Sequence, residues 1–295
     1  MSVKNFTDPI PTPDDLVEKL SGCEIIIAMR ERTRFDAAIL ARLPRLKLLI
    51  TTGMRNNAID VGAASAQAIC VCGTRSLSSP TPELTWGLLL ALARHIPAEV
   101  AAIRGGGKWQ TQIGTGLSGK TLGILGLGKI GTQIARYAHA FEMPVLAWSP
   151  HLTKEICQAA GAELAPGLDE LLQRADIVTL HMVLADSTRG MMGARELGLL
   201  KPTALLVNTS RGPLIDEKSL VQALTENRIA GAALDVYDME PLPPSHPLRT
   251  LRNVVATPHI GYVTRENYQI FYGDAVEDIR AWLNGSPVRT LPSVN

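Results

Sequence analysis

Several polar and ionisable side chains stand directly after short apolar stretches in the C-terminal two thirds of the sequence. A histidine can accept or donate a proton near neutral pH, because the unperturbed pKa of imidazole is about 6.5. An arginine presents a rigid planar fork of donors that fits a carboxylate. Ligands of open α/β sheets bind at the carboxyl ends of the strands, so chemistry is expected at these positions. The residues are Ser149, His181, Thr209, Arg211, Asp235 and His259.

A glycine-rich turn, GLGKIG, precedes all of these positions. The hydrophobic period around it changes from strand-like to helix-like and back, which is typical of a βαβ unit that binds a dinucleotide. Gly126 permits the tight turn, Gly128 lets the backbone approach a pyrophosphate, and Gly131 lets the helix pack closely on the strand. We expect the phosphates on the N–H groups at the helix start, near Lys129 and Ile130.

Strands and helices alternate in two runs, which predicts an α/β fold with two domains. A Rossmann-type doubly wound parallel sheet is expected at residues 81–263, and a smaller α/β domain at residues 1–80 together with 264–295. A long apolar helix at residues 83–103 joins the runs, with Thr81 as its cap, and Pro97 must kink or split it. A short strand is expected at residues 3–6. The six strands of the larger domain are expected at residues 121–125, 145–148, 177–181, 204–208, 231–234 and 254–257.

Composition narrows the class of partner. The chain has 295 residues, 19% of them charged, and a net charge of +1, so neither nucleic acid nor an anionic membrane surface is an expected partner. No apolar run approaches the length of about 20 residues that spans a bilayer, and the N-terminus lacks the apolar core of a signal peptide. The sequence therefore predicts a cytoplasmic protein. The four cysteines are scattered and predict buried thiols, with no metal site.

Three phrases, LLVNTSRGPLIDEKSLVQAL, AGAALDVYDMEPLP and NVVATPHIGYVT, resemble signatures of the D-isomer-specific 2-hydroxyacid dehydrogenases. The GLGKIG turn, ADIVTLH and ELTWGLLLALAR are similar to that family in order and spacing, so the resemblance covers nearly the whole chain. It implies a smaller flavodoxin-like domain, hydride transfer between NAD or NADP and a small 2-keto or D-2-hydroxy acid, and a homodimer through the cofactor domain. Reduction of glyoxylate or hydroxypyruvate is one form that this reaction takes.

The resemblance also implies roles for individual residues. Arg211 corresponds to the substrate arginine, Glu240 to the acid beside the base, and His259 to the catalytic base. Asp235 would hold the nicotinamide carboxamide, and Thr209 and Gly261 would contact the cofactor, with His181 on the adenine side. The backbone N–H groups of Gly53, Met54 and Arg55 would face the substrate carboxylate.

The chemistry of alcohol oxidation beside a carboxylate fits this assignment. It needs a group that removes the hydroxyl proton, a cation that holds the carboxylate, and a hydride acceptor. His259 and Arg211 suit the first two. A neighbouring carboxylate would fix the histidine tautomer and favour imidazolium, and Glu240 is the candidate.

The chain departs from the family pattern at three places. Ser149, followed by His151, stands where an NAD enzyme usually has an acidic residue, which leaves room for a 2′-phosphate and favours NADP slightly over NAD. The chain begins at what resembles the second strand of the family, so the smaller domain is expected to lack one βα unit. Arg55 replaces an acidic or neutral residue and is either a second cation for the substrate or a solvated side chain.

Other functions stay open at this point. One is a dinucleotide-sensing protein that keeps the fold but not the activity, although the complete set of Arg211, Glu240 and His259 favours an enzyme. Oxidation of formate or phosphite is another. Formate-oxidising relatives carry glutamine where this chain has Glu240, and this difference disfavours formate oxidation. The sequence does not identify the 2-hydroxy acid.

Overall fold

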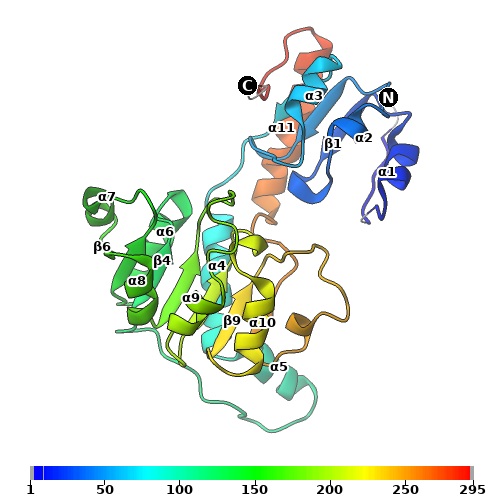
Figure 1. Cartoon of the computed structure of the whole chain (residues 1–295). Coiled ribbons are helices and arrows are strands. Elements are labelled where there is room, and N and C mark those ends of the chain that lie inside the picture. Colours follow the sequence, from blue (N-terminus) through cyan, green and yellow to red (C-terminus); the bar gives the residue numbers. More distant parts are fainter. Residues whose placement is uncertain (1–2, 9, 293–295) are drawn as a thin grey trace. The chain divides into compact units, whose positions relative to one another are not determined.

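The computed structural model describes residues 3–8 and 10–292 and divides the chain into two compact units (Figure 1). One unit comprises Met1–Leu77 and Thr264–Asn295, and the other comprises Ser78–Val263. The first boundary lies three residues before the one expected from the sequence. The smaller unit is therefore built from two segments that are far apart in the chain.

The smaller unit contains a parallel sheet with the strand order β1-β2-β3. The prediction of a short strand at residues 3–6 is wrong, because residues 3–8 form neither a helix nor a strand. The strands are β1 (Ile25–Ala28), β2 (Leu48–Thr51) and β3 (Cys70–Gly73). The helices are α1 (Pro13–Leu20), η1 (Arg30–Arg32), α2 (Ala37–Leu40), α3 (Val61–Ala66) and α11 (Arg265–Leu283).

The two faces of this sheet are covered by helices from the two segments. Alternate strand residues point to opposite faces, and those that include Leu49 and Val71 pack with α1, α2 and α3. The opposite face, with Leu48 and Ile50, packs against α11, which contributes the buried Ala275. The C-terminal helix is therefore part of the core of the N-terminal unit.

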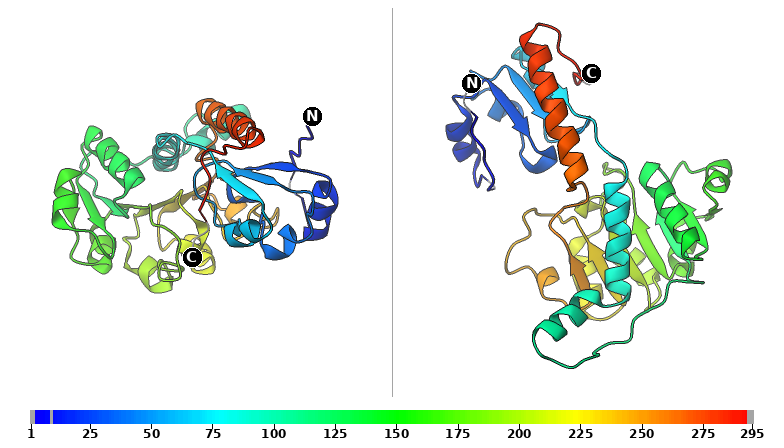
Figure 2. Two further views of the ribbon diagram at one scale, coloured as in Figure 1. Left: turned by 90° about the horizontal axis from the view of Figure 1, so that it is seen from above. Right: turned by 180° about the vertical axis from the view of Figure 1, so that it is seen from behind.

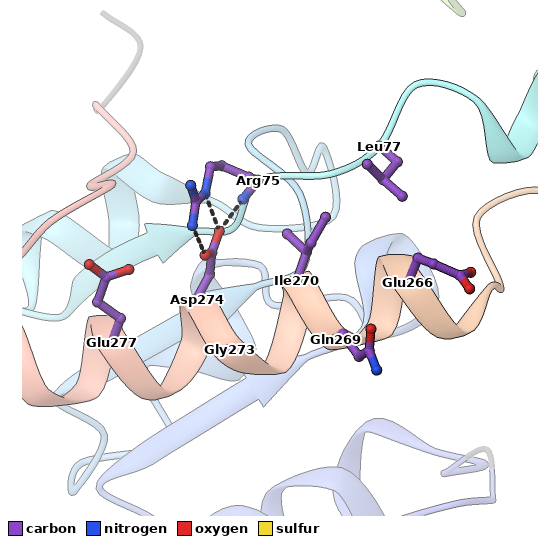
Figure 3. Close-up of a pocket in the computed structure, with 8 residues that line it drawn as sticks. All are labelled: Arg75, Leu77, Glu266, Gln269, Ile270, Gly273, Asp274 and Glu277. Carbon is purple, nitrogen blue, oxygen red and sulfur yellow. Dashed lines mark hydrogen bonds and ion pairs between the residues drawn. The ribbon is translucent and has the colours of Figure 1, made fainter.

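Arg75 and Asp274 join the end of the first segment to α11. The backbone N–H of Arg75 donates to Asp274 at 2.7 Å, and its guanidinium donates to both carboxylate oxygens at 2.6 and 3.1 Å (Figure 3). These hydrogen bonds lower the pKa of the buried Asp274 carboxyl. The shallow depression in Figure 3 runs along α11 and includes none of the site residues expected from the sequence.

The larger unit contains a seven-stranded parallel sheet with the order β10-β9-β8-β7-β4-β5-β6, which is the doubly wound arrangement. Six strands agree with the expected positions to within about a residue at either end. The seventh, β6, has only two residues and was not expected, because so short a strand leaves no hydrophobic run to detect. The strands are β4 (Leu122–Leu125), β5 (Val145–Trp148), β6 (Glu163–Leu164), β7 (Ile177–Leu180), β8 (Leu205–Asn208), β9 (Gly231–Leu234) and β10 (Val254–Ala256).

Helices cover both faces of this sheet, so its central strands are buried throughout. The first face packs against α4 (Pro80–Ala93), α6 (Lys129–Ala140) and α7 (Lys154–Ala159), and the cyan helix α4 is seen along the sheet in Figure 2. The second face packs against α8 (Leu168–Arg174), α9 (Ala194–Leu199) and α10 (Glu217–Thr225). Two short 3₁₀ turns, η2 (Gly212–Leu214) and η3 (Pro247–Arg249), lie in the loops after β8 and β9.

The long apolar helix expected at residues 83–103 is split into α4 and α5 (Ile96–Arg104), as its internal proline requires. His95 adopts a left-handed conformation at the break. Helix α4 begins at Pro80, three residues before the expected start, and its cap residue is Ser79, two residues before the expected Thr81. Among the described residues no single helix is long and apolar enough to cross a membrane, and α4 and α5 pass that test only as a pair bent by 64°.

Candidate active site

Three neighbouring strands of the larger sheet deliver the candidate catalytic residues to one edge. The strands β8, β9 and β10 pair in parallel, so their carboxyl ends lie side by side. Arg211 follows β8, Glu240 follows β9 and His259 follows β10. The sequence predicted this convergence for Arg211 and His259 from their places after strands.

Glu240 and His259 are in direct contact. The Glu240 Oε2 lies 2.6 Å from Nδ1 of His259, and the Glu240 Oε1 accepts a 3.0 Å hydrogen bond from the N–H of Tyr237. Partial burial opposes ionisation of Glu240, but the hydrogen bonds and the positive charges of His259 and Arg211 outweigh it and lower the pKa of this carboxyl. Glu240 is therefore a carboxylate at neutral pH, and Nδ1 of His259 carries the proton that it accepts.

Arg211 occupies a tightly built turn. The Asn208 side chain donates to the carbonyl of Arg211 at 2.9 Å, and Nη1 of Arg211 donates to the carbonyl of Ser210 at 2.8 Å. A Cβ on Gly212 would overlap the backbone of Tyr237, so only glycine lets this turn approach the segment that carries Glu240. The local packing thus couples the position of Arg211 to that of the Glu240 loop.

Asp235 fixes the loop on which His259 lies. Its buried carboxylate accepts hydrogen bonds from the hydroxyl of Thr257 at 2.6 Å and from the N–H groups of Ile260 and Gly261, both at 2.8 Å. Burial raises the pKa of Asp235, and these three donors oppose the rise. His259 itself has a left-handed backbone (φ +54°) inside this network. The structure therefore gives Asp235 and Gly261 a positioning role that the sequence did not indicate.

The glycine-rich turn fits a dinucleotide. A Cβ on Gly126, whose φ is +96°, would lie 2.6 Å from the carbonyl oxygen of His181, and one on Gly131 would overlap the carbonyl oxygen of Gly126. A Cβ on Gly128 meets nothing within 4 Å. Gly128 is the cap residue of α6 and offers no side-chain cap, so the first N–H groups of the helix, from Lys129 onwards, are open to an anion.

The other predicted cofactor residues lie at the same edge of the sheet or near it. Ser149 follows β5 and is partly exposed, and His151 is exposed two residues later. His181 follows β7 and contacts the hydroxyl of Thr179 at 2.9 Å, and desolvation lowers its pKa to about 3, so the imidazole is neutral. Thr209 is buried and bonds the hydroxyl of Thr85 on α4 at 2.7 Å, which ties that helix to the end of β8.

The expected substrate loop lies in the smaller unit, after β2. Gly53 has a φ of +95°, and its N–H donates to the hydroxyl of the buried Thr74 at 2.8 Å. This N–H is therefore engaged within the unit in this structure, and its expected role at a substrate carboxylate stays a prediction. Met54 and Arg55 are exposed. A Cβ on Gly53 would lie 2.5 Å from Nη1 of Arg30, so the Arg30 guanidinium covers this glycine.

Three residues that support the site were not singled out from the sequence. Thr257 bonds Asp235, Thr85 bonds Thr209, and the hydroxyl of Tyr237 donates towards the carbonyl of Thr257 at 2.9 Å. Hydroxyl residues near strand ends are common, so only the contacts distinguish these. In the part of the chain that the structure describes, no group of three or more His, Cys, Asp or Glu side chains could hold a metal ion.

Comparison with known proteins places this geometry in a family. Residues 86–261 match the model of the NAD binding domain of D-isomer specific 2-hydroxyacid dehydrogenases. The chain is 40% identical over 261 residues to glyoxylate reductase of Aeropyrum pernix, with 85% of this chain and 78% of the relative aligned. The crystal structure of phosphoglycerate oxidoreductase from Vibrio cholerae O395 superimposes with a TM-score of 0.91 at 36% identity, covering 95% of this chain and 90% of that one.

The chain therefore belongs to the D-isomer-specific 2-hydroxyacid dehydrogenase family, a class of nicotinamide-dependent oxidoreductases with two α/β domains. The predicted family and fold class are confirmed. It is also 39% identical over 277 residues to D-3-phosphoglycerate dehydrogenase of Methanocaldococcus jannaschii. That alignment covers 93% of this chain but only 52% of the relative, so the chain spans about half the length of that protein.

Proposed function

We propose that this chain catalyses the reversible reduction of a small 2-keto acid to the D-2-hydroxy acid with a nicotinamide dinucleotide. The observation that carries the proposal is the contact between Glu240 and His259 at the carboxyl edge of the sheet, beside the turn that holds Arg211. These groups supply a proton donor, a carboxylate that supports its charge, and a cation for the substrate. Family membership supports the same reaction class.

The proton has a defined route in this proposal. Because Glu240 occupies Nδ1, the other ring nitrogen of His259, Nε2, is the one that faces the reaction. In reduction Nε2–H gives its proton to the carbonyl oxygen of the keto acid, and the Glu240 carboxylate stabilises the imidazolium before this transfer. In oxidation the neutral Nε2 removes the hydroxyl proton.

Arg211 is proposed to bind and orient the substrate. Its planar guanidinium can hold the substrate carboxylate through two parallel hydrogen bonds and polarise the adjacent carbonyl oxygen. The Met54 and Arg55 N–H groups are proposed to assist at the carboxylate, a role that rests on the family resemblance. When bound, the nicotinamide ring supplies the hydride. Glyoxylate and hydroxypyruvate are the first substrates to test.

The dinucleotide is proposed to sit on the first turn of α6, where Gly128 leaves open space. Thr209, Asp235, His181 and Gly261 remain its proposed neighbours along the strand ends. No acidic side chain follows β5 directly, and the partly exposed Ser149 and the exposed His151 are polar groups that can receive a 2′-phosphate. We therefore favour NADP slightly over NAD.

A homodimer through the larger unit is part of the proposal. Residues 105–116 form an exposed segment without a helix or strand, and it carries Trp109, 79% exposed, and Ile113, 96% exposed. Helix α5 adds Ile96, Val100 and Ile103, all exposed. Apolar side chains gathered in this way mark an interaction surface. A cytoplasmic location and the absence of a nucleic-acid or membrane partner remain predictions from the sequence.

The decisive experiment is a panel of 2-keto acids assayed with NADH and with NADPH. We expect oxidation of the reduced cofactor with at least one short keto acid. Cofactor binding without turnover on any member of the panel would contradict the proposal and favour a dinucleotide sensor. Sedimentation of the native chain beside a Trp109→Asp, Ile113→Asp variant tests the dimer, which the double variant should dissociate.

A further inference from the structure

Glu217 joins helix α10 to both ends of the segment that carries Glu240. It lies in the first turn of α10, and its Oε2 accepts a 3.1 Å hydrogen bond from the N–H of Asp238. Its Oε1 lies 3.1 Å from Nε2 of His246, and both side chains are only 19% exposed. The two partners of Glu217 stand on either side of Glu240 in the chain.

The protonation of His246 follows from its second contact. Its Nδ1 accepts a 3.3 Å hydrogen bond from the N–H of Leu248, so Nδ1 bears no proton in this arrangement. The proton of the neutral ring is then on Nε2, which donates to Glu217. Both oxygens of Glu217 thus accept hydrogen bonds from the loop after β9, and neither contact requires a charged histidine.

We call the contacts of Glu217 with Asp238 and His246 the Glu217 clamp, and helix α10 anchors it. Helix α10 is capped by the Asp216 side chain, which accepts from the N–H of Ser219 at 2.7 Å, and it is fixed in the core by Leu220 and Leu224. Asp238 follows Tyr237, whose N–H holds Oε1 of Glu240. Glu217 therefore binds the peptide next to the one whose N–H holds the Glu240 carboxylate.

We propose that Glu217, with His246, is a positioning residue for the reaction: it keeps the Glu240 carboxylate in place against His259. This inference rests on the proposed function only for its kinetic readout. Glu217 does not touch the reacting atoms, and it acts through the loop after β9. Its loss should therefore lower kcat more than it weakens binding of the cofactor.

The kinetic test compares Glu217→Gln with Glu226→Gln, a control on the C-terminal cap of the same helix whose side chain is 49% exposed. An amide oxygen can still accept, but its NH₂ group faces the Nε2–H of His246, so only one of the two contacts survives. With glyoxylate or hydroxypyruvate as substrate, we expect kcat about tenfold lower for Glu217→Gln, an unchanged KM for the cofactor, and no change for the control. Equal losses in the two variants would overturn the inference.

A double-variant cycle separates positioning from general destabilisation. If Glu217 acts through Glu240, the Glu217→Gln substitution should cost little further activity in a Glu240→Gln background. Losses that simply multiply would show that Glu217 acts elsewhere. Rescue on the His246 side is a second check: His246→Gln can place an amide near the position of Nε2, whereas His246→Asn can keep only the contact with Leu248. The Gln variant should be the more active of the two.

Proton NMR tests the inference without turnover. The Nδ1–H of His259, in a 2.6 Å contact with Glu240, should give a strongly downfield resonance that is absent in His259→Ala. We expect this resonance to broaden or move upfield in Glu217→Gln and to stay in place in Glu226→Gln. An unmoved resonance in Glu217→Gln overturns the inference even if the enzyme is active. A moved resonance in a protein inactive on every keto acid supports the clamp while refuting the proposed reaction.

Discussion

The ring of His259 and the carboxylate of Glu240 meet at 2.6 Å although 19 residues separate them in the chain. The contact forms because β9 and β10 are neighbours in the sheet and end at the same edge. It defines which nitrogen of His259 is committed to Glu240 and which one is left for a substrate. The expected effects of the His259 and Glu240 variants follow from these different roles of the two ring nitrogens.

His259→Ala should lower kcat by about 10²–10⁴-fold, the usual contribution of a positioned proton donor. His259 is partly exposed on a loop, so the fold and cofactor binding should survive. Steady-state kinetics with circular dichroism and cofactor titration checks this. A variant that keeps most of its turnover would remove His259 from the mechanism.

Arg211→Lys should reduce kcat/KM by about 10²-fold or more. The main cause should be weaker binding of the keto acid, because an ammonium group cannot form the paired hydrogen bonds of a guanidinium. Arg195→Lys is the matched control, since Arg195 is an exposed arginine paired with Asp169. If the two lysine variants behave alike, Arg211 does not bind the substrate.

Glu240→Gln should remove a contribution to stability that depends on pH in a defined direction. The folded protein lowers the pKa of Glu240 below its ordinary value of 4.5, so the carboxylate stabilises the fold above that pH, and this contribution is lost as the pH falls through the lowered value. Because a third of the side chain is exposed, the effect should be at most about 1 kcal/mol. Urea unfolding of both proteins between pH 3 and 7 should show a difference that closes on the acid side. A difference that widens there would contradict the assignment.

Ser149→Asp should shift the preference of the enzyme towards NAD. A carboxylate after β5 repels a 2′-phosphate and can accept hydrogen bonds from ribose hydroxyls. We expect the ratio of kcat/KM for NADH to that for NADPH to rise at least about tenfold, a change of about 1.4 kcal/mol. An unchanged ratio means that the 2′-position lies elsewhere.

Two glycine substitutions in the turn before α6 should differ in kind. Gly131→Ala places a Cβ against the carbonyl oxygen of Gly126 and should destabilise the larger unit. Gly128→Ala meets no protein atom and should leave the melting temperature unchanged while weakening the cofactor. Calorimetry together with cofactor titration distinguishes the two, and equal destabilisation would refute the assignment of Gly128.

All strands of both sheets except β6 could be predicted because each is a short apolar run, which parallel strands covered on both faces require. The cap residue of α4 could not be predicted from the sequence. Ser79–Pro80 and Thr81–Pro82 carry the same signal. The helix begins at the first pair, although the Ser79 side chain makes no capping hydrogen bond, and the Thr81 hydroxyl donates to the carbonyl of Gly261. Local patterns cannot distinguish two equal caps.

In the site, the places of Arg211 and His259 follow from strand ends, which are visible in the sequence. The contact of Glu217 with His246 could not be predicted in this way, because it depends on how α10 lies against a loop 29 residues further along the chain. Glu217 has an ordinary place in a helix first turn, where acidic residues are favourable in any case. The same applies to the N–H of Gly53, whose acceptor Thr74 lies on a later strand end.

The two-segment construction of the smaller unit has a consequence for synthesis on the ribosome. Leu48 and Ile50 are covered by α11, which is translated only after all of Ser78–Val263. At about 5–20 residues per second, this apolar sheet face waits about 10–40 s for its partner helix. The larger unit is continuous in the chain and can complete its own core during that interval. The smaller unit thus completes its core after the larger unit, although its first segment is translated before the larger unit.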